Sequence, residues 1–351
     1  MPPEETLDAT IALFLAQDGV TNGAIYALLA LSLVLVFTIT RVIFIPQGEF
    51  VAYGALTLAA FERGAFPLTA VLAVLLGLAA FAADLVREPA ARTPRRIATG
   101  LAADVGFPVA LLLAAWHVAP LKLGPAVEVP LTLAMIAALG PFLYRLVFRP
   151  LAEASVLVLL IAAVGVHLAL VGLGLVFFGA EGFRTQPLTS AMFEVGPALV
   201  TGQSLWVLGT AGGLIAALWA FFEHTLTGKA LRATAVNRLG ARLVGIPTAS
   251  AGRIAFALAA LIGALSGVLI APVTTVFYDT GFLTGLKGFV AAIIGGLVSY
   301  PLGAAAAILV GLVEAFASFF ASTFKEVIVF TIIIPVLLWR SLRTVHVEDE
   351  E

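Results

Sequence analysis

The sequence contains no cysteine among its 351 residues. Disulfides, thiolate metal sites and a cysteine nucleophile are therefore excluded, and the redox compartment stays undetermined. Charged residues make up only 11% of the chain, whereas a soluble domain has about 25%. Hydrophobic residues make up 61%, and long apolar runs recur from end to end. Because runs of about 18 residues or more can cross a bilayer core as helices, a soluble fold is excluded.

The sequence also lacks the motifs of an enzyme active site. It has neither Gly-x-Ser-x-Gly nor His-Glu-x-x-His. Gly228-Lys229 is not a phosphate-binding loop, since Glu223 stands where that motif needs its first glycine and Ala230 follows the lysine. We predict no metal site, no cofactor on this chain and no nucleic-acid partner. The four histidines are scattered and never at metal-ligand spacing: His117, His167, His224 and His346.

The apolar runs predict an all-α, polytopic membrane bundle in a single domain, 1–351. The N-terminus, MPPEETLDAT, has no basic region that would mark a signal peptide, and 6–16 reads as an interfacial lead-in. We expect about 11 crossings, in a range of about 8 to 11. The two weakest, 44–62 and 284–299, could be re-entrant or broken helices. The crossings are 21–40, 44–62, 66–86, 99–119, 129–147, 151–178, 203–222, 253–271, 284–299, 302–321 and 325–340.

Basic residues are sorted strongly between the two sides of this predicted bundle. With eleven crossings, 14 of the 19 lysines and arginines fall on one side. Because positive charge is retained in the cytoplasm, that side is predicted to be cytoplasmic, with the N-terminus outside and the C-terminus inside. The 14 residues are Arg41, Arg87, Arg92, Arg95, Arg96, Arg145, Arg149, Lys229, Arg232, Arg238, Arg242, Arg253, Arg340 and Arg343.

The longest polar stretch of the chain, 224–253, lies on this side. It carries five basic residues and no acidic one. Its centre, from Leu231 to Leu243, has leucine or alanine at every fourth position, which predicts a short helix with one apolar face. Gly245 and Pro247 are expected to end that helix. Such a stretch is either an ordinary cytoplasmic loop or an element on which another protein docks.

Ionisable residues at membrane depth are costly and are therefore functional candidates. Glu49 begins the crossing 44–62 and is expected near its cytoplasmic end. Lys287 could reach the outer interface with its ammonium group, and Glu314 could bond to a neighbouring helix. The residues expected on a translocation path or at a gate are Asn22, Tyr26, Gln47, Gly48, Glu49, Lys287, Phe289 and Glu314.

Glycine pairs four residues apart occur in several crossings and predict close helix packing. The pairs are Gly19/Gly23, Gly209/Gly213, Gly263/Gly267 and Gly281/Gly285.

Four stretches, in order, resemble the permeases of branched-chain amino acid ABC importers, in the form usually called the H-type subunit. NGAIYALLALSLVLVFTITRVIFIPQGEFVAYGA resembles the first two helices of that family. YRLVFRPLAEASVLVLLIAAVGV resembles its segment around an arginine-proline pair. GKALRATAVNRLGARLVGIPT and GLKGFVAAIIGGLVSYPLGAAAAILVGLVEA resemble its cytoplasmic loop and late helices. The resemblance covers about 21–62, 141–178 and 220–340.

The resemblance implies a permease of the cell membrane that pairs with a second, M-type permease, two cytoplasmic ATPases and an external binding protein. ATP and magnesium would then be bound by the partner subunits. The polar stretch would be the loop that couples the permease to the ATPases. Its expected coupling residues are Lys229, Leu231, Arg232, Asn237, Arg238, Leu239, Arg242 and Gly245.

The sequence departs from the family pattern in three places. FIPQGE, from Phe44 to Glu49, stands where the family commonly has Asn-x-Ala-His-Gly-Glu, so the substrate or gate there could differ. Asn237 and Arg238 replace acidic residues, which implies an ATPase with an unusually acidic cleft. Residues 81–128 look like an insertion of about two helices.

We therefore predict an importer permease that passes branched-chain or other small apolar amino acids by alternating access, with no chemistry of its own. The alternative is a transporter or channel for a small amide or urea-type solute, driven by an ion gradient through the ionisable residues at depth. No inverted repeat supports that alternative.

Overall fold

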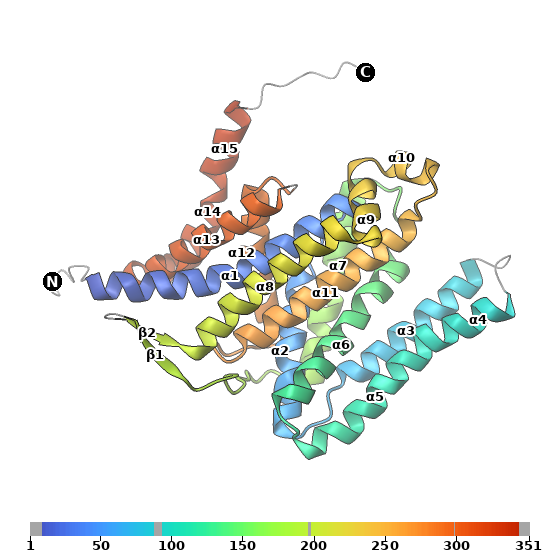
Figure 1. The fold of residues 1–351 in the computed structure, drawn as a ribbon, viewed down its shortest axis with the longest axis horizontal. Helices are drawn as coiled ribbons and strands as arrows, with labels where there is room; N and C mark the ends of the chain where they lie inside the picture. Colours follow the sequence, from blue (N-terminus) through green and yellow to red (C-terminus); the bar gives the residue numbers. More distant parts are fainter. Residues whose placement is uncertain (1–8, 88–92, 196–197, 298, 344–351) are drawn as a thin grey trace.

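The computed structural model describes residues 9–87, 93–195, 198–297 and 299–343, and it confirms an all-α membrane bundle (Figure 1). Two short strands are the exception to the helical fold among these residues. The helices are α1 (Ala9–Thr40), α2 (Gln47–Arg63), α3 (Thr69–Arg87), α4 (Pro94–Gly100), α5 (Phe107–Val118), α6 (Pro125–Leu143), α7 (Val156–Phe178), α8 (Gly202–His224), α9 (Leu226–Val236), α10 (Arg238–Leu243), α11 (Thr248–Ile270), α12 (Thr280–Ile294), α13 (Tyr300–Phe320), α14 (Lys325–Thr331) and α15 (Ile333–Arg343).

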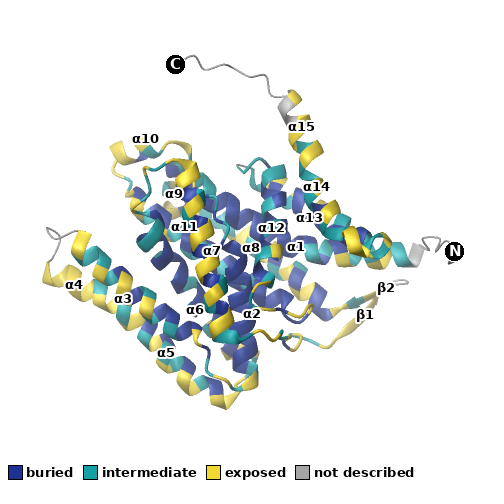
Figure 2. Cartoon of the chain, turned by 180° about the vertical axis from the view of Figure 1, so that it is seen from behind, coloured by how far each residue is buried: buried dark blue, intermediate teal, exposed yellow. Residues whose placement is uncertain are grey.

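Helix α2 is the centre of the bundle, and every residue from Gln47 to Phe61 is buried (Figure 2). The neighbouring helices approach α2 closely because they have glycine at the points of contact. A Cβ on Gly267 of α11 would lie 2.1 Å from the Val51 carbonyl oxygen, and one on Gly281 of α12 would lie 2.3 Å from the Gly48 carbonyl oxygen. The pairs on α11 and α12 are therefore packing glycines, as expected.

The same packing joins the first helix to α13. A Cβ on Gly19 would lie 2.7 Å from the Cα of Leu312, and one on Gly23 would lie 2.7 Å from that of Ile308. Gly209 and Gly213 do not pack against another helix of this chain as expected, because no atom of the described residues lies within 4 Å of a Cβ built on either one. These two glycines face outward from α8.

Helices α3, α4 and α5 stand at one edge of the bundle (Figure 1). A π-helical segment, η2 (Leu101–Gly106), joins α4 to α5, and a short 3₁₀ turn, η3 (Ala119–Leu121), follows them. The segment predicted as an insertion, 81–128, thus contains the end of α3, the whole α4–α5 rod and the first residues of α6.

The two ends of the bundle carry different structures. Helices α9 and α10 lie at one end, and the antiparallel strands β1 (Met192–Val195) and β2 (Ala198–Thr201) lie at the other (Figure 1). The sequence analysis assigned no element between Phe178 and Gly202, so this hairpin was missed. A Gly-Pro pair between the two runs, at 196–197, marks a turn and could have signalled it; that pair lies outside the described residues.

One expectation about helix boundaries needs correction. The lead-in 6–16 is no separate element where it is described, because α1 runs unbroken from Ala9 through Gln17-Asp18-Gly19 to Thr40. Nine described segments are long and apolar enough to cross a membrane. The other two expected crossings, α2 and α12, are helices of 17 and 15 residues. The total number of crossings and the orientation of the termini stay predictions.

Candidate functional site

The central helix α2 begins in the middle of the bundle. The Gln47 side chain donates to the carbonyl oxygen of Ala259 (2.9 Å), which lies halfway along α11. Residues 41–46 reach this depth in a non-helical conformation. These six residues end in a turn at 45–46, and they place Gln47 level with the middle of α11. Such backbone is tolerated at depth because protein surrounds it, and Phe44 there is fully buried.

Glu49 and His167 form an ion pair at this level. The Nδ1 atom of His167 contacts the Glu49 carboxylate, and His167 lies halfway along α7. The expectation that Glu49 lies near the cytoplasmic end was therefore wrong, because 41–46 enters the bundle before α2 starts. The ring of Phe282 on α12 covers the imidazole, with centroids 4.7 Å apart. Three helices thus meet at one polar point in an apolar core.

This polar point has more hydrogen-bond acceptors than donors. The second Glu49 oxygen, Oε2, and the Gln47 oxygen, Oε1, are buried without a hydrogen-bond partner among the described residues. A buried acceptor left without a donor costs about 1–3 kcal/mol, so it needs an explanation. We call Gln47, Glu49 and His167 the Glu49 site. On its α7 side it leaves one acceptor, Glu49 Oε2, to a donor from outside the chain, whereas Gln47 lies two residues earlier on α2 and bonds to α11.

A second polar cluster joins α12 to three other helices. Lys287, buried halfway along α12, donates to Glu314 of α13 (2.6 Å) and to Glu326 of α14 (3.2 Å). The hydroxyl of Tyr26 on α1 donates to the other oxygen of Glu314 (2.6 Å). We call these four residues the Lys287 cluster. Lys287 does not reach the interface as the sequence allowed, because two carboxylates hold it inside.

The structure brings only some of the expected path residues together. Gly48 has no side chain to offer a substrate, and its backbone packs against Gly281. Asn22 lies one turn before Tyr26 on α1 and is half-buried. Phe289 is half-buried and packs against the main hydrophobic core. The Glu49 site and the Lys287 cluster are separate, and α12 contributes to both.

The polar stretch forms two helices where one was expected. Asn237 is extended (φ −149°, ψ 100°) and its Oδ1 accepts from the amide of Gly240 (2.8 Å), so it ends α9 and caps α10. Asparagine is among the preferred N-cap residues, so the sequence did carry this signal. Gly245 follows α10 in the left-handed region (φ 84°) and ends it as expected.

The break at Asn237 divides the leucines of the stretch into two groups. Leu231 is buried with Leu35, Ile39 and Ala255, so it anchors α9 to the bundle and is not available to a partner. Leu239 and Leu243 are 68% and 80% exposed. The single apolar face predicted from the sequence is thus split between an inward and an outward side.

The outward side of α9 and α10 combines apolar and basic side chains. Arg238 donates to the Ala152 carbonyl oxygen (3.3 Å), and Arg242 donates to Thr248 (3.0 Å). Arg232 pairs with Glu223 (3.0 Å), and Lys229 is exposed. The exposed apolar residues around them are Leu226, Val236, Leu239, Leu243 and Val244. This surface, which we call the α9–α10 face, stands out from the end of the bundle (Figure 1).

Sequence reasoning missed several residues of these sites. Glu326 was not singled out, although a carboxylate beside a predicted apolar crossing was a usable signal. The pairing of His167 with Glu49 could not be found from spacing, because 118 residues separate them. Phe282 carried no signal beyond its aromatic ring.

Comparison with known proteins agrees with this architecture. The family model described as "Branched-chain amino acid transport system / permease component" matches residues 98–337. The permease LivH of Escherichia coli K12 is 27% identical over 340 residues, 93% of each chain, and BraD of Pseudomonas aeruginosa is 25% identical over 337 residues, 92% of each. LivH of Salmonella typhimurium is 30% identical over 215 residues, 58% of this chain and 68% of the relative.

All three are called permease proteins of high-affinity branched-chain amino acid transport systems. No solved structure matches the chain. The helices and the relatives together describe a multi-pass membrane protein that serves as a permease and not as an enzyme. The chain belongs to the family of permease components of branched-chain amino acid transport systems.

Proposed function

We propose that this chain is one permease subunit of an ATP-driven importer for branched-chain or other small apolar amino acids. The Glu49 site carries the proposal. An amino acid brings an ammonium group with three donors, and the Glu49 carboxylate has a buried oxygen, Oε2, without a partner among the described residues. The buried and apolar surroundings suit an aliphatic side chain, whereas a charged side chain would lose its hydration there.

The Glu49 carboxylate is only 1% exposed, so the substrate reaches it only after the helices move. We infer alternating access, in which the site opens to one side of the membrane and then to the other. Helix α12 is suited to transmit such movement because Phe282 covers His167 and Lys287 ties the same helix to α13 and α14.

The energy for that movement would come from partner subunits, because this sequence has no nucleotide-binding motif. The proposed complex contains a second, M-type permease, two cytoplasmic ATPases that bind ATP and magnesium, and an external binding protein. The α9–α10 face would dock on an ATPase. Exposed leucines would enter an apolar cleft there, and Arg238 and Arg242 would meet acidic groups around it.

The test of the docking face is the double variant Arg238→Glu with Arg242→Glu in the full complex. Reversing two charges at an interface should abolish both uptake and co-purification of the ATPases, while the chain still inserts into the membrane. The readouts are amino acid uptake into vesicles and mass spectrometry of the complex purified in mild detergent. Arg95→Glu, an exposed arginine outside α9 and α10, is the matched control and should retain both.

Unchanged uptake and unchanged ATPase recovery in the double variant would contradict docking on this face. If the unmodified chain purified alone at every salt concentration, the gradient-driven alternative would replace the ATP-driven one. The ionisable Glu49 site and Lys287 cluster would then be the groups to test for proton or sodium coupling.

A further inference from the structure

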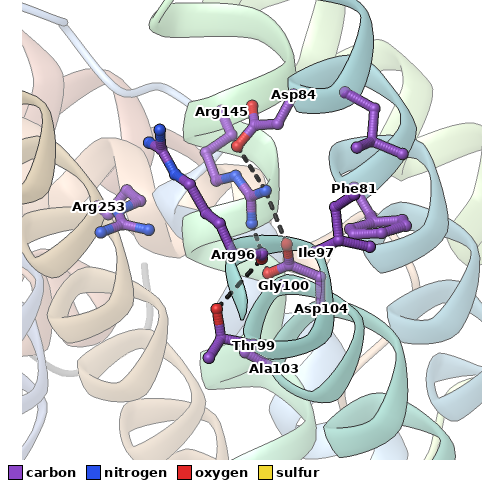
Figure 3. Close-up of a pocket in the computed structure, with 11 residues that line it drawn as sticks. Phe81, Asp84, Arg96, Ile97, Thr99, Gly100, Ala103, Asp104, Arg145 and Arg253 are labelled. Atoms are coloured by element: carbon purple, nitrogen blue, oxygen red, sulfur yellow. Dashed lines mark hydrogen bonds and ion pairs between the residues drawn. The ribbon is translucent and has the colours of Figure 1, made fainter. Parts of the chain in front are cut away.

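The pair of Glu49 and His167 is less completely bonded than another buried charge of the bundle. The guanidinium of Arg145 donates to Asp84 (2.7 Å) and to Asp104 (2.8 Å) at once (Figure 3). Glu49 and His167, in contrast, join one atom to one atom, Oε1 to Nδ1. A buried ion pair is stable only when further hydrogen bonds satisfy its remaining polar atoms, so the open state of this pair needs a reason.

Each member of the pair keeps one polar atom for a further partner. Oε2 of Glu49 is buried and has no hydrogen bond among the described residues. His167 uses its Nδ1 atom, and no described residue bonds to its Nε2 atom. A carboxylate accepts at both oxygens, and an imidazolium donates from both nitrogens. The pair therefore offers one free acceptor on α2 and one free donor on α7.

A second bond fixes the level of α7 against α2. The hydroxyl of Tyr53, one turn after Glu49, donates to the carbonyl oxygen of Leu170 (2.7 Å), which lies one turn after His167. The ring of Phe282 packs on the imidazole, with centroids 4.7 Å apart. These contacts hold both side chains in place before a ligand arrives, so the free acceptor and the free donor form a preorganised set.

Charge decides which ligand suits this set. As carboxylate and imidazolium the pair is neutral, so an amine at Oε2 would add a positive charge to the interior, and an acid at Nε2 would add a negative one. An uncompensated buried charge is costly. A zwitterion brings one charge of each sign and leaves the site neutral. Asp279, exposed before α12, also acts on the Glu49 carboxylate but is itself acidic, so His167 is the cation available to a carboxylate of the ligand.

We propose that Glu49 and His167 together bind the zwitterion of an amino acid, and that His167 is the residue that selects its carboxylate group. The ammonium group would donate to Glu49 Oε2, and the carboxylate would accept from His167 Nε2. This inference rests on the proposed function and deepens it, because it names both groups by which the substrate is recognised. An amide or urea carries neither charge, so its hydrogen bonds to the pair would be weaker.

The test compares leucine with analogues that lack one of its two charges. Isothermal titration calorimetry is done on the complex purified without the external binding protein, so that the ligand can reach only the permease. Leucine should bind about 10- to 100-fold more tightly than 3-methylbutylamine, which has only the ammonium group, or 4-methylpentanoate, which has only the carboxylate. The neutral 4-methylpentanamide should also bind more weakly than leucine.

The variants separate the two halves of the site. His167→Gln should weaken the binding of leucine by about 10- to 100-fold without weakening that of 3-methylbutylamine, whose ammonium group bonds to Glu49. Glu49→Gln should weaken leucine without weakening 4-methylpentanoate. The matched control is Tyr53→Phe, which removes the second bond between α2 and α7 but keeps both charges. It should weaken all the ligands to a similar degree.

Equal weakening of all the ligands by His167→Gln, as in Tyr53→Phe, would overturn the inference, because His167 would then only hold α7 in place. Binding of 4-methylpentanamide or of either charged analogue as tight as that of leucine would overturn it as well, while leaving an amino acid importer intact. If the unmodified complex bound no leucine, the proposed function would fail together with the inference. The comparison of ligands on the unmodified complex needs no variant, so it decides the matter even where a variant does not fold.

Discussion

The Glu49 site and the Lys287 cluster are both buried, charged and attached to α12, but they differ in how completely their groups are paired. Lys287 has two carboxylate partners, and Glu314 is bonded through both oxygens. Glu326 keeps one oxygen, Oε2, buried and without a partner among the described residues, although its side chain as a whole is 34% exposed. At the Glu49 site the unpaired acceptors lie in the dry interior.

The difference separates a structural role from a binding role. Within the Lys287 cluster, Glu314 is bonded through both of its oxygens, to Lys287 and to Tyr26, and so joins α1, α12 and α13 without an acceptor left over. A site with unused acceptors at mid-depth gains a hydrogen bond when a donor arrives. We therefore assign the positioning of α12, α13 and α1 to the Lys287 cluster, and contact with the substrate to the Glu49 site.

The largest effect on stability is expected from Lys287→Met. It leaves two carboxylates without their cation, which costs about 3–5 kcal/mol when a buried pair loses one partner. Thermal unfolding of the purified chain in detergent measures the loss. Adding Glu314→Gln to Lys287→Met should recover most of it, because the remaining buried charge is removed. If the single variant were as stable as the unmodified chain, the cluster would have no structural role.

The largest effect on transport is expected from Glu49→Gln, which keeps the volume of the side chain but removes its charge. A hydrogen bond to a charged group is worth about 1.5–3 kcal/mol, so uptake at low substrate concentration should fall about 10- to 100-fold. The measurement is uptake by the reconstituted complex. The control is Glu62→Gln at the other end of α2, which should transport normally. Normal uptake by Glu49→Gln would remove this site from the path.

An intermediate effect is expected from Gly48→Ala. This variant tests whether the Glu49 site and the Lys287 cluster both depend on the close contact between α2 and α12. The new Cβ would lie 2.0 Å from the carbonyl oxygen of Gly281, so α2 and α12 would have to separate. Overpacking of this kind costs about 1–3 kcal/mol. Gly213→Ala, in open space on α8, is the control and should be neutral or up to about 1 kcal/mol stabilising. Equal stability of both variants would show that the crossing is not tight.

The smallest effect is expected from Tyr26→Phe. It removes one donor from Glu314 while Lys287 continues to neutralise the carboxylate, so the loss should be about 1.5 kcal/mol, the low end for a hydrogen bond to a charged group. Chemical unfolding of the two proteins in the same detergent would measure it. A loss as large as that of Lys287→Met would mean that the hydroxyl, and not the ammonium group, holds the cluster together.

The sequence by itself determined the membrane bundle, the sorting of basic residues to one end of it and the family. These properties depend on local composition, because each apolar run inserts according to its own length and hydrophobicity. It also marked Glu49, Lys287 and Glu314 as unusual, since charge at depth is costly wherever it occurs. The close packing of Gly263, Gly267 and Gly281 followed from spacing alone.

Only the tertiary structure decided which of these residues meet. Glu49 pairs with His167 because the non-helical residues 41–46 bring the start of α2 level with the middle of α7 and α11, and no local pattern specifies that level. Lys287 stays inside the bundle because its ammonium group bonds to Glu314 and Glu326, which belong to two other helices. The break at Asn237 divides the polar stretch into α9 and α10, and Leu231 on α9 packs against the bundle. Contacts between distant segments depend on how whole helices pack, and the sequence of one segment does not contain that information.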